Sequence, residues 1–345
     1  MRYKLLGNSG LRVSELCLGT MTFGEDWGWG TSREESRKIY DVFRDAGGNF
    51  FDTANFYTNG TSERLLGEFA QEHRQGVVLA TKFTNAPPGK DANAAGNHRK
   101  SMMQAVEGSL KRLKTDYIDL YWMHIWDQIT PVEEVMRGFD DLVRQGKILY
   151  AGVSDAPAWW IAQGNTLAEL RGWTKFVGLQ LEYSLVERTV ERELLPMAKA
   201  LGIGVTAWSP LAGGWLSGKY GSGKDSGGRL DDEQLRNNAL QVNERAKAIA
   251  AEVTAIADKI GRSAAQVALA WLRNSTPPVI PILGARKMIQ LQENLASIEV
   301  TLNADQLARL DAVSKISMGF PHEFLNKELV TAFSFGGMKE LIDAA

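Results

Sequence analysis

The chain has 345 residues but only one cysteine, Cys17, so no intrachain disulfide can form. This composition fits a reducing compartment, and we expect a cytoplasmic protein. No stretch approaches the roughly 18 apolar residues of a membrane span, and residues 1–10 lack an apolar signal core. The formal net charge of −2 gives no reason to expect nucleic acid or an anionic membrane as a partner.

Histidines are also few, and their spacing argues against a metal site. Of the four, His73, His98 and His322 have no cysteine or carboxylate partner at a ligand spacing. No G-x-G-x-x-G follows a strand-like run, so a Rossmann cofactor site is not supported. No G-x-S-x-G or Walker pattern appears either.

Short apolar runs alternate with helical patterns along the whole chain. The runs predict eight strands, at residues 16–19, 49–52, 77–82, 118–124, 148–154, 176–180, 204–207 and 279–282. Helices are expected between them, among others at residues 32–46, 62–70, 244–260 and 263–272. Eight strand–helix units close a parallel (β/α)8 TIM barrel, and a doubly wound open sheet is the alternative. We expect one α/β domain over residues 1–345, with an N-terminal β-hairpin and a C-terminal extension.

Two helix starts carry capping signals. Thr130-Pro131-x-Glu133 predicts an N-cap, a proline at the first helical position and a capping-box glutamate. Ser263 with Gln266 three residues on predicts a second capping box. The glycine-rich residues 213–229 are interpreted as a long loop.

Four ionisable side chains follow consecutive strands. Asp52, Lys82 and His124 end the second, third and fourth strands, and Tyr57 lies in the loop after the second. In parallel barrels this edge carries the active site. Each residue alone has a plainer explanation: a turn-capping aspartate, a solvated lysine, a hydrogen-bonded core histidine and a packing tyrosine. Their joint occurrence at one rim favours a catalytic set.

The set is suited to protonating a carbonyl that receives hydride. A tyrosine hydroxyl has an ordinary pKa near 10, and a nearby ammonium lowers it. Lys82 could supply that charge and Asp52 could orient it. His124 could donate a hydrogen bond to the carbonyl oxygen.

Several motifs, spaced in order from Gly7 to about Val313, resemble those of the aldo-keto reductases. Phe51-Asp52-Thr53-Ala54-x-x-Tyr57 looks like the first signature of this family, and residues 109–120, followed by His124 at the end of the strand, look like the second. The branch that is most similar holds aryl-alcohol-type reductases and potassium channel beta subunits. The resemblance implies that Tyr57 is the proton donor, Lys82 and Asp52 its tuning pair, and His124 the orienting group.

The resemblance also implies a nicotinamide cofactor extended across the barrel mouth. The positions that match its nicotinamide end are Gly19, Thr20, Met21, Asp52, Ser154, Gln180 and Trp208, the last as the stacking ring. Those that match its pyrophosphate and adenosine ends are Ser209, Leu211, Gly213, Lys219, Arg229, Gly284, Arg286, Gln290, Glu293 and Asn294. Asp155 stands where many members have asparagine and, as an acceptor-only carboxylate, is left out of the set. Arg286 and Lys287, basic residues at a helix start, favour NADP(H) over NAD(H).

Three functions stay open at this point. The first is NADPH-dependent, reversible reduction of an aldehyde or ketone, a small-molecule partner. The second is a cofactor-binding regulatory subunit with little turnover, and the third is a Schiff-base aldolase that uses Lys82. Trp27, Trp29 and Trp126 fall in or beside rim loops, which favours an apolar or aromatic substrate pocket. The tail from Gly319 is a candidate to close that pocket.

Overall fold

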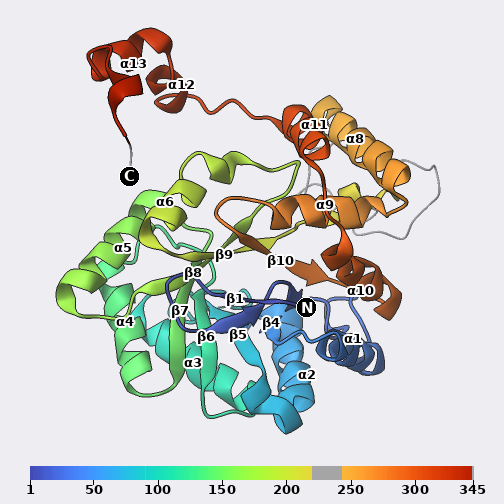
Figure 1. Ribbon diagram of the computed structural model, residues 1–345. Helices are drawn as coiled ribbons and strands as arrows, with labels where there is room; N and C mark the ends of the chain where they lie inside the picture. The colour runs from blue at the N-terminus through green and yellow to red at the C-terminus, as the bar shows by residue number, and fades with distance from the viewer. Residues whose placement is uncertain (90, 220–242, 344–345) are drawn as a thin grey trace.

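A closed barrel of eight parallel strands forms the centre of the protein (Figure 1). The computed structural model describes residues 1–89, 91–219 and 243–343. Around the barrel the strands follow the order β10-β3-β4-β5-β6-β7-β8-β9, which confirms the (β/α)8 prediction. They are β3 (Cys17–Gly19), β4 (Phe50–Asp52), β5 (Val78–Phe83), β6 (Ile118–Met123), β7 (Ile148–Ser154), β8 (Phe176–Glu182), β9 (Gly204–Trp208) and β10 (Val279–Gly284).

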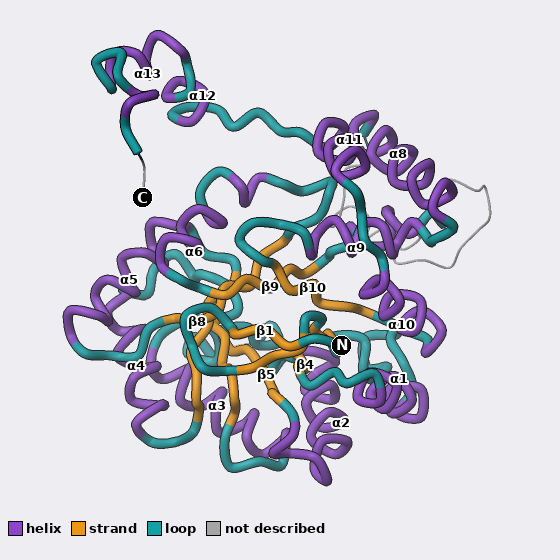
Figure 2. The backbone as a smooth tube through the Cα atoms, viewed as in Figure 1, coloured by secondary structure: helices purple, strands orange, loops and turns teal. Residues whose placement is uncertain are grey.

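Helices surround the strands on the outside of the barrel (Figure 2). They are α1 (Arg33–Asp45), α2 (Thr61–Ala70), α3 (Arg99–Leu113), α4 (Val132–Arg144), α5 (Ala158–Arg171), α6 (Leu194–Leu201), α8 (Glu244–Ile260), α9 (Ala264–Arg273), α10 (Met288–Leu295) and α11 (Ala304–Ser314). No helix among these residues is long and apolar enough to cross a membrane.

One predicted capping box is confirmed and the other is wrong. Ser263 and Gln266 form a reciprocal capping box at the start of α9. At α4 the first helical residue is Val132, Pro131 takes the N-cap position, and no side chain caps the helix. The Thr130 hydroxyl instead donates to the Asp127 carboxylate at 2.6 Å. This contact within the loop replaces the predicted cap of α4 by Thr130.

Large rings fill the inside of the barrel. The Trp122 indole, on β6, is fully buried and lies against two glycines, one on β7 and one on β8. A Cβ on Gly152 would sit 2.2 Å from this ring, and one on Gly178 would sit 2.8 Å from it. Only glycine fits at these two positions, because side-chain atoms cannot approach so closely.

A small antiparallel hairpin covers the amino-terminal end of the barrel. It consists of β1 (Tyr3–Leu5) and β2 (Arg12–Ser14), which confirms the expected N-terminal hairpin. Leu6 and Val13 are fully buried and join the interior cluster. The Asn8 amide donates to the Gly202 carbonyl at 2.7 Å, just before β9. The hairpin therefore lies opposite the carboxyl ends of the strands.

The C-terminal segment extends away from the barrel (Figure 1). Two short helices, α12 (His322–Leu325) and α13 (Glu328–Ser334), lie in it. Its large apolar side chains are exposed, among them Phe320 at 84% and Phe333 at 76%. No described residue after Asn294 lines the cavity treated below, so the expectation that the tail closes that cavity is not met.

Candidate active site

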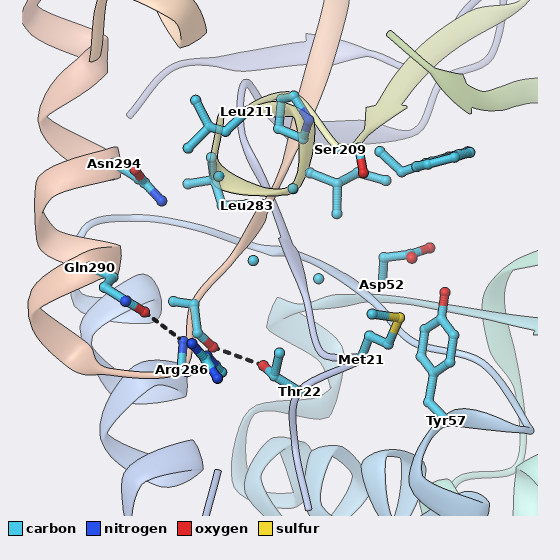
Figure 3. A pocket seen from close by; sticks show the side chains of 18 of the residues that line it. Met21, Thr22, Asp52, Tyr57, Ser209, Leu211, Leu283, Arg286, Gln290 and Asn294 are labelled. Carbon is cyan, nitrogen blue, oxygen red and sulfur yellow. Dashed lines mark hydrogen bonds between the residues drawn. The ribbon is translucent and has the colours of Figure 1, made fainter. Parts of the chain in front are cut away.

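A cavity of about 510 Å³ lies at the carboxyl ends of the barrel strands (Figure 3). Its lining includes residues at or near the ends of six strands, namely Gly19, Asp52, Ser154, Gln180, Trp208 and Gly284. This is the edge of a barrel at which active sites are built. Three of the four ionisable residues picked out from the sequence, Asp52, Tyr57 and His124, line this cavity.

Lys82 reaches the cavity through its hydrogen bonds rather than by lining it. It is fully buried on β5, and its Nζ forms an ion pair with the Asp52 carboxylate. The same nitrogen donates to the Thr53 carbonyl at 2.7 Å and to the Tyr57 hydroxyl at 3.3 Å. Burial acts to lower the pKa of Lys82, but Asp52 and Tyr57 raise it above its ordinary value overall. The ammonium therefore stays charged at neutral pH.

Tyr57 is held as a neutral phenol. Burial raises the pKa of Tyr57 above its ordinary value, and the lowering effect of Lys82 only partly offsets this. The net shift is the reverse of what the sequence argument expected from the lysine alone. A phenol that keeps its proton at neutral pH, beside an ammonium that stabilises the phenolate, is suited to give a proton during a reaction.

His124 follows β6 directly and faces Tyr57 edge-on, with 5.7 Å between the ring centroids. Burial, reinforced by the charge of Lys82, lowers the pKa of His124 well below its ordinary value, so the ring is neutral at pH 7. Its Nδ1 lies 3.2 Å from the side-chain nitrogen of Asn85. Asn85 was not predicted from the sequence, where its only signal is its place three residues after Lys82.

Two neighbouring groups bear on the predicted carboxamide site. Gln180 donates its amide to Oδ1 of Asp52 at 3.1 Å, so both carboxylate oxygens of Asp52 are engaged. The Ser154 hydroxyl is buried in the cavity wall and has no well-formed hydrogen bond to the residues described, although it lies close enough to Asp155 to help lower the pKa of that carboxyl. A buried hydroxyl without a well-formed hydrogen bond is unfavourable, and a ligand amide would satisfy it. This is the feature that best fits a nicotinamide carboxamide.

Trp208 and Asp155 form one wall of the cavity together. The Trp208 indole nitrogen donates to Oδ1 of Asp155 at 3.1 Å. Asp155 takes a left-handed backbone conformation, with φ of +44°, which orients its side chain toward the indole. Burial raises the pKa of Asp155, whereas Trp208 and Lys82 lower it in part. The residue that the sequence argument set aside therefore lies inside the site.

The loop after β9 supplies the next part of the lining. Ser209, Leu211, Gly213 and Lys219, which were predicted to bind the cofactor, all line the cavity. Gly213 and the adjacent Gly214 have positive φ values of 66° and 99°, which only glycine adopts without strain. A glycine turn beside Lys219 suits an anion such as a pyrophosphate, and the turn itself is closed by the Gly214 amide, which donates to the Leu211 carbonyl at 2.9 Å. Arg229 lies outside the described residues.

The far end of the cavity lies between β10 and α10 (Figure 3). All five predicted residues there contribute to the lining, namely Gly284, Arg286, Gln290, Glu293 and Asn294. The backbone of this loop is fixed on both sides. The Arg286 amide donates to Gln290 at 2.9 Å, and Thr22 donates its hydroxyl to the Ala285 carbonyl at 2.8 Å.

Three predicted residues lie behind the lining. Thr20 is buried, and its hydroxyl is within 3.1 Å of the Asp52 carbonyl, so it supports the strand end. Trp29 packs on Trp27 with 5.5 Å between centroids, and only Trp27 lines the cavity. Trp126 packs on two neighbouring tryptophans of α5 instead. Phe56 and Thr22, which the sequence argument did not select, line the cavity too.

This chain resembles one known protein family along most of its length. The chain matches the family model "Aldo/keto reductase family" over residues 15–315. It is 39% identical over 327 residues to a norsolorinic acid reductase of Emericella nidulans, with 92% of this chain and 82% of the relative covered. It is 36% identical over 340 residues to an NADP(+) aryl-alcohol dehydrogenase of Phanerodontia chrysosporium, at 92% and 87% coverage.

A bacterial relative is equally similar. An uncharacterized oxidoreductase of Bacillus subtilis is 39% identical over 328 residues, at 91% coverage of this chain and 96% of the relative. No group of three or more potential metal-ligating side chains occurs within the described parts of the chain. On its family match and its relatives, this chain belongs to the aldo/keto reductase family and is an oxidoreductase that acts on carbonyl or alcohol groups.

Proposed function

We propose that the protein reduces an aldehyde or ketone to the alcohol, reversibly, with hydride from NADPH and the proton from Tyr57. The observation that carries the proposal is the contact of Tyr57 with Lys82, at 3.3 Å, at the edge of a cavity large enough for an extended ligand. Asp52 and Tyr57 lie at one end of this cavity and Arg286 and Asn294 at the other (Figure 3).

The catalytic residues divide the proton chemistry between them. Bound NADPH supplies the hydride that adds to the carbonyl carbon. Tyr57 gives its phenolic proton to the carbonyl oxygen, and the alcohol O–H bond forms as the phenol O–H bond breaks. Lys82 stabilises the phenolate left behind, and Asp52 holds Lys82 in place. Neutral His124 donates a hydrogen bond to the same oxygen.

The described lining suits NADPH along its length. The Ser154 hydroxyl would bind the carboxamide and Trp208 would stack on the ring. The turn at Gly213 and the Lys219 ammonium would take the pyrophosphate. The remaining lining residues assigned to the cofactor are Gly19, Met21, Asp52, Gln180, Ser209, Leu211, Gly284, Gln290, Glu293 and Asn294. Arg286 would meet a 2′-phosphate, which favours NADPH over NADH.

The substrate that we propose is an aromatic aldehyde or ketone. Trp27 lies 6.4 Å from the Tyr57 ring and 5.4 Å from Phe56, so an aromatic wall stands beside the proton donor. Flat aromatic compounds pack well on such a wall. The printed names of the relatives, aryl-alcohol dehydrogenase and norsolorinic acid reductase, support the same class.

The Schiff-base aldolase is disfavoured by the state of Lys82. A Schiff base requires a neutral amine, but Lys82 is paired with Asp52 and its pKa is raised. The alternative of a regulatory subunit is decided by measuring turnover, because a purely regulatory protein would reduce no aldehyde. The cytoplasmic location and the single domain over residues 1–345 remain our predictions.

The proposal is tested by following NADPH absorbance with a panel of aromatic and aliphatic aldehydes of similar size. We expect turnover, with higher kcat/KM for the aromatic members. Trp27→Leu should lose this preference, by about fivefold if one stacking contact of roughly 1 kcal/mol is removed. Failure of every aldehyde in this panel, and of matched ketones, to be reduced would favour the regulatory alternative.

A further inference from the structure

Asn85 is fixed against His124 by the loops that follow β5 and β6. Its side-chain nitrogen lies 3.2 Å from Nδ1 of His124, and both residues line the cavity. The backbone carbonyl of Asn85 accepts a hydrogen bond from the Asn55 side chain at 3.0 Å. Asn85 is therefore held from two sides.

The preceding residue adds a second constraint. Thr84 has a φ of +100°, a conformation that β-branched residues rarely adopt. Its hydroxyl accepts from the Asn97 side chain at 2.8 Å and from the His124 amide at 3.3 Å. A strained backbone persists only where its surroundings over-determine it. These contacts tie the Asn85 loop to the residue whose side chain it faces.

The contact between Asn85 and His124 decides which ring nitrogen carries the hydrogen. An amide nitrogen only donates hydrogen bonds, so Nδ1 of His124 must accept. A neutral imidazole has one N–H, and it must then be on Nε2. If the amide were turned over, its oxygen would accept from Nδ1–H and Nε2 would be a bare acceptor. A bare Nε2 cannot donate to a carbonyl oxygen.

We propose that Asn85 is a positioning residue that holds His124 as the Nε2–H tautomer, so that the ring donates to the substrate oxygen. The donation to the substrate oxygen rests on the carbonyl reduction proposed above. The assignment of the Nε2–H tautomer does not depend on it. Two nearly isosteric substitutions separate the effects. Asn85→Leu removes the donor, and Asn85→Asp replaces it with an acceptor.

The tautomer is read directly, without substrate or cofactor, by nitrogen-15 NMR of the histidine rings. The chain has only four histidines, so the His124 signals are assigned by their loss in His124→Gln. We expect Nε2–H in the unmodified protein, a mixture of tautomers in Asn85→Leu, and Nδ1–H or an imidazolium in Asn85→Asp. Nδ1–H in the unmodified protein, or an unchanged tautomer in Asn85→Leu, would overturn the proposal.

Kinetics then separate positioning from general structural support. Asn85→Leu should lower kcat about twofold to tenfold with a smaller change in KM, since a mixture of tautomers leaves only part of the His124 rings with the Nε2–H donor that matters when charge develops on the oxygen. Asn85→Asp should lower kcat further where the His124 ring is neutral and let it recover toward lower pH, because the carboxylate raises the pKa of His124 and the imidazolium regains the Nε2–H donor. A wild-type kcat and pH profile in both variants would contradict the role in catalysis. Absence of turnover in the unmodified protein would instead refute the proposed function and leave the NMR result to stand alone.

Discussion

The indole nitrogen of Trp208 donates to Oδ1 of Asp155 at 3.1 Å, so the ring expected to stack on the nicotinamide is oriented by a carboxylate. Both side chains line the cavity, and the backbone of Asp155 is held at a positive φ. An amide at this position could donate to a carboxamide oxygen, but a carboxylate can only accept. The carboxylate also brings a negative charge to the end of the cavity at which the redox chemistry is proposed.

Asp155→Asn should shift the balance between the two redox states of the cofactor. The oxidised nicotinamide is a cation and the reduced one is neutral, so Asp155 should favour NADP(+). We expect the variant to weaken NADP(+) binding by about threefold to tenfold more than NADPH binding, which corresponds to roughly 0.7–1.4 kcal/mol. The two dissociation constants are measured by quenching of tryptophan fluorescence. The ratio of the two dissociation constants serves as an internal control, because general damage to the site would weaken the binding of both cofactor forms equally. An unchanged ratio would refute the predicted effect of Asp155.

Lys82→Met should abolish most activity and also destabilise the protein. The substitution leaves Asp52 as a buried charge without its partner, and breaking such a pair costs about 3–5 kcal/mol. Urea unfolding measures the loss. The double variant Asp52→Asn with Lys82→Met is the matched control, since it removes both charges.

The double variant should regain much of the stability but not the activity. If Lys82→Met were as stable as the unmodified protein, the Asp52–Lys82 pair would not be the buried ion pair described here. If the double variant regained activity, Lys82 would have no part in tuning Tyr57.

The pH profile should follow Tyr57. Reduction needs the protonated phenol, and because burial raises the pKa of Tyr57 above its ordinary value, that form persists through the neutral range. We expect kcat/KM for reduction to fall only above about pH 10, and alcohol oxidation, which needs the phenolate, to rise toward the same range. A fall in reduction centred near neutral pH would identify a different group as the acid.

Arg286→Ala should weaken NADPH binding and leave NADH binding almost unchanged. A charge-assisted contact to phosphate is worth roughly 1.5–3 kcal/mol, so NADPH should be preferred about tenfold or more in the unmodified protein. Arg262→Ala is a control at an exposed arginine that pairs with Glu299 and does not line the cavity. Equal dissociation constants for NADH and NADPH in the unmodified protein would refute the assignment. Added salt should weaken the NADPH preference, since part of it is Coulombic.

The barrel could be predicted from the sequence because its strands are apolar runs buried on both faces. β5 and β6 are buried at every position, and such runs are recognised without knowing their neighbours. The site could be predicted once the strands were located, because Asp52 and His124 lie where strands end. Their positions along the chain were enough to assign both residues to the site.

Contacts between distant segments could not be predicted in the same way. Asn85 meets His124 across 39 residues, and Trp208 meets Asp155 across 53, so no local spacing reveals either pair. Thr130 was misassigned because Asp127 competes for its hydroxyl within the loop. The net pKa shift of Tyr57 depends on burial, which a list of charged neighbours does not contain.

The most direct test of the central claim is the rate of NADPH-dependent reduction of an aromatic aldehyde by Tyr57→Phe. The substitution removes only the proposed proton donor and keeps the ring against Trp27. We predict that turnover falls about a hundredfold or more, while the dissociation constant for NADPH changes by less than about twofold. Tyr3→Phe, in the N-terminal hairpin, should behave like the unmodified protein. A Tyr57→Phe enzyme that reduces the aldehyde at a near wild-type rate would contradict the account.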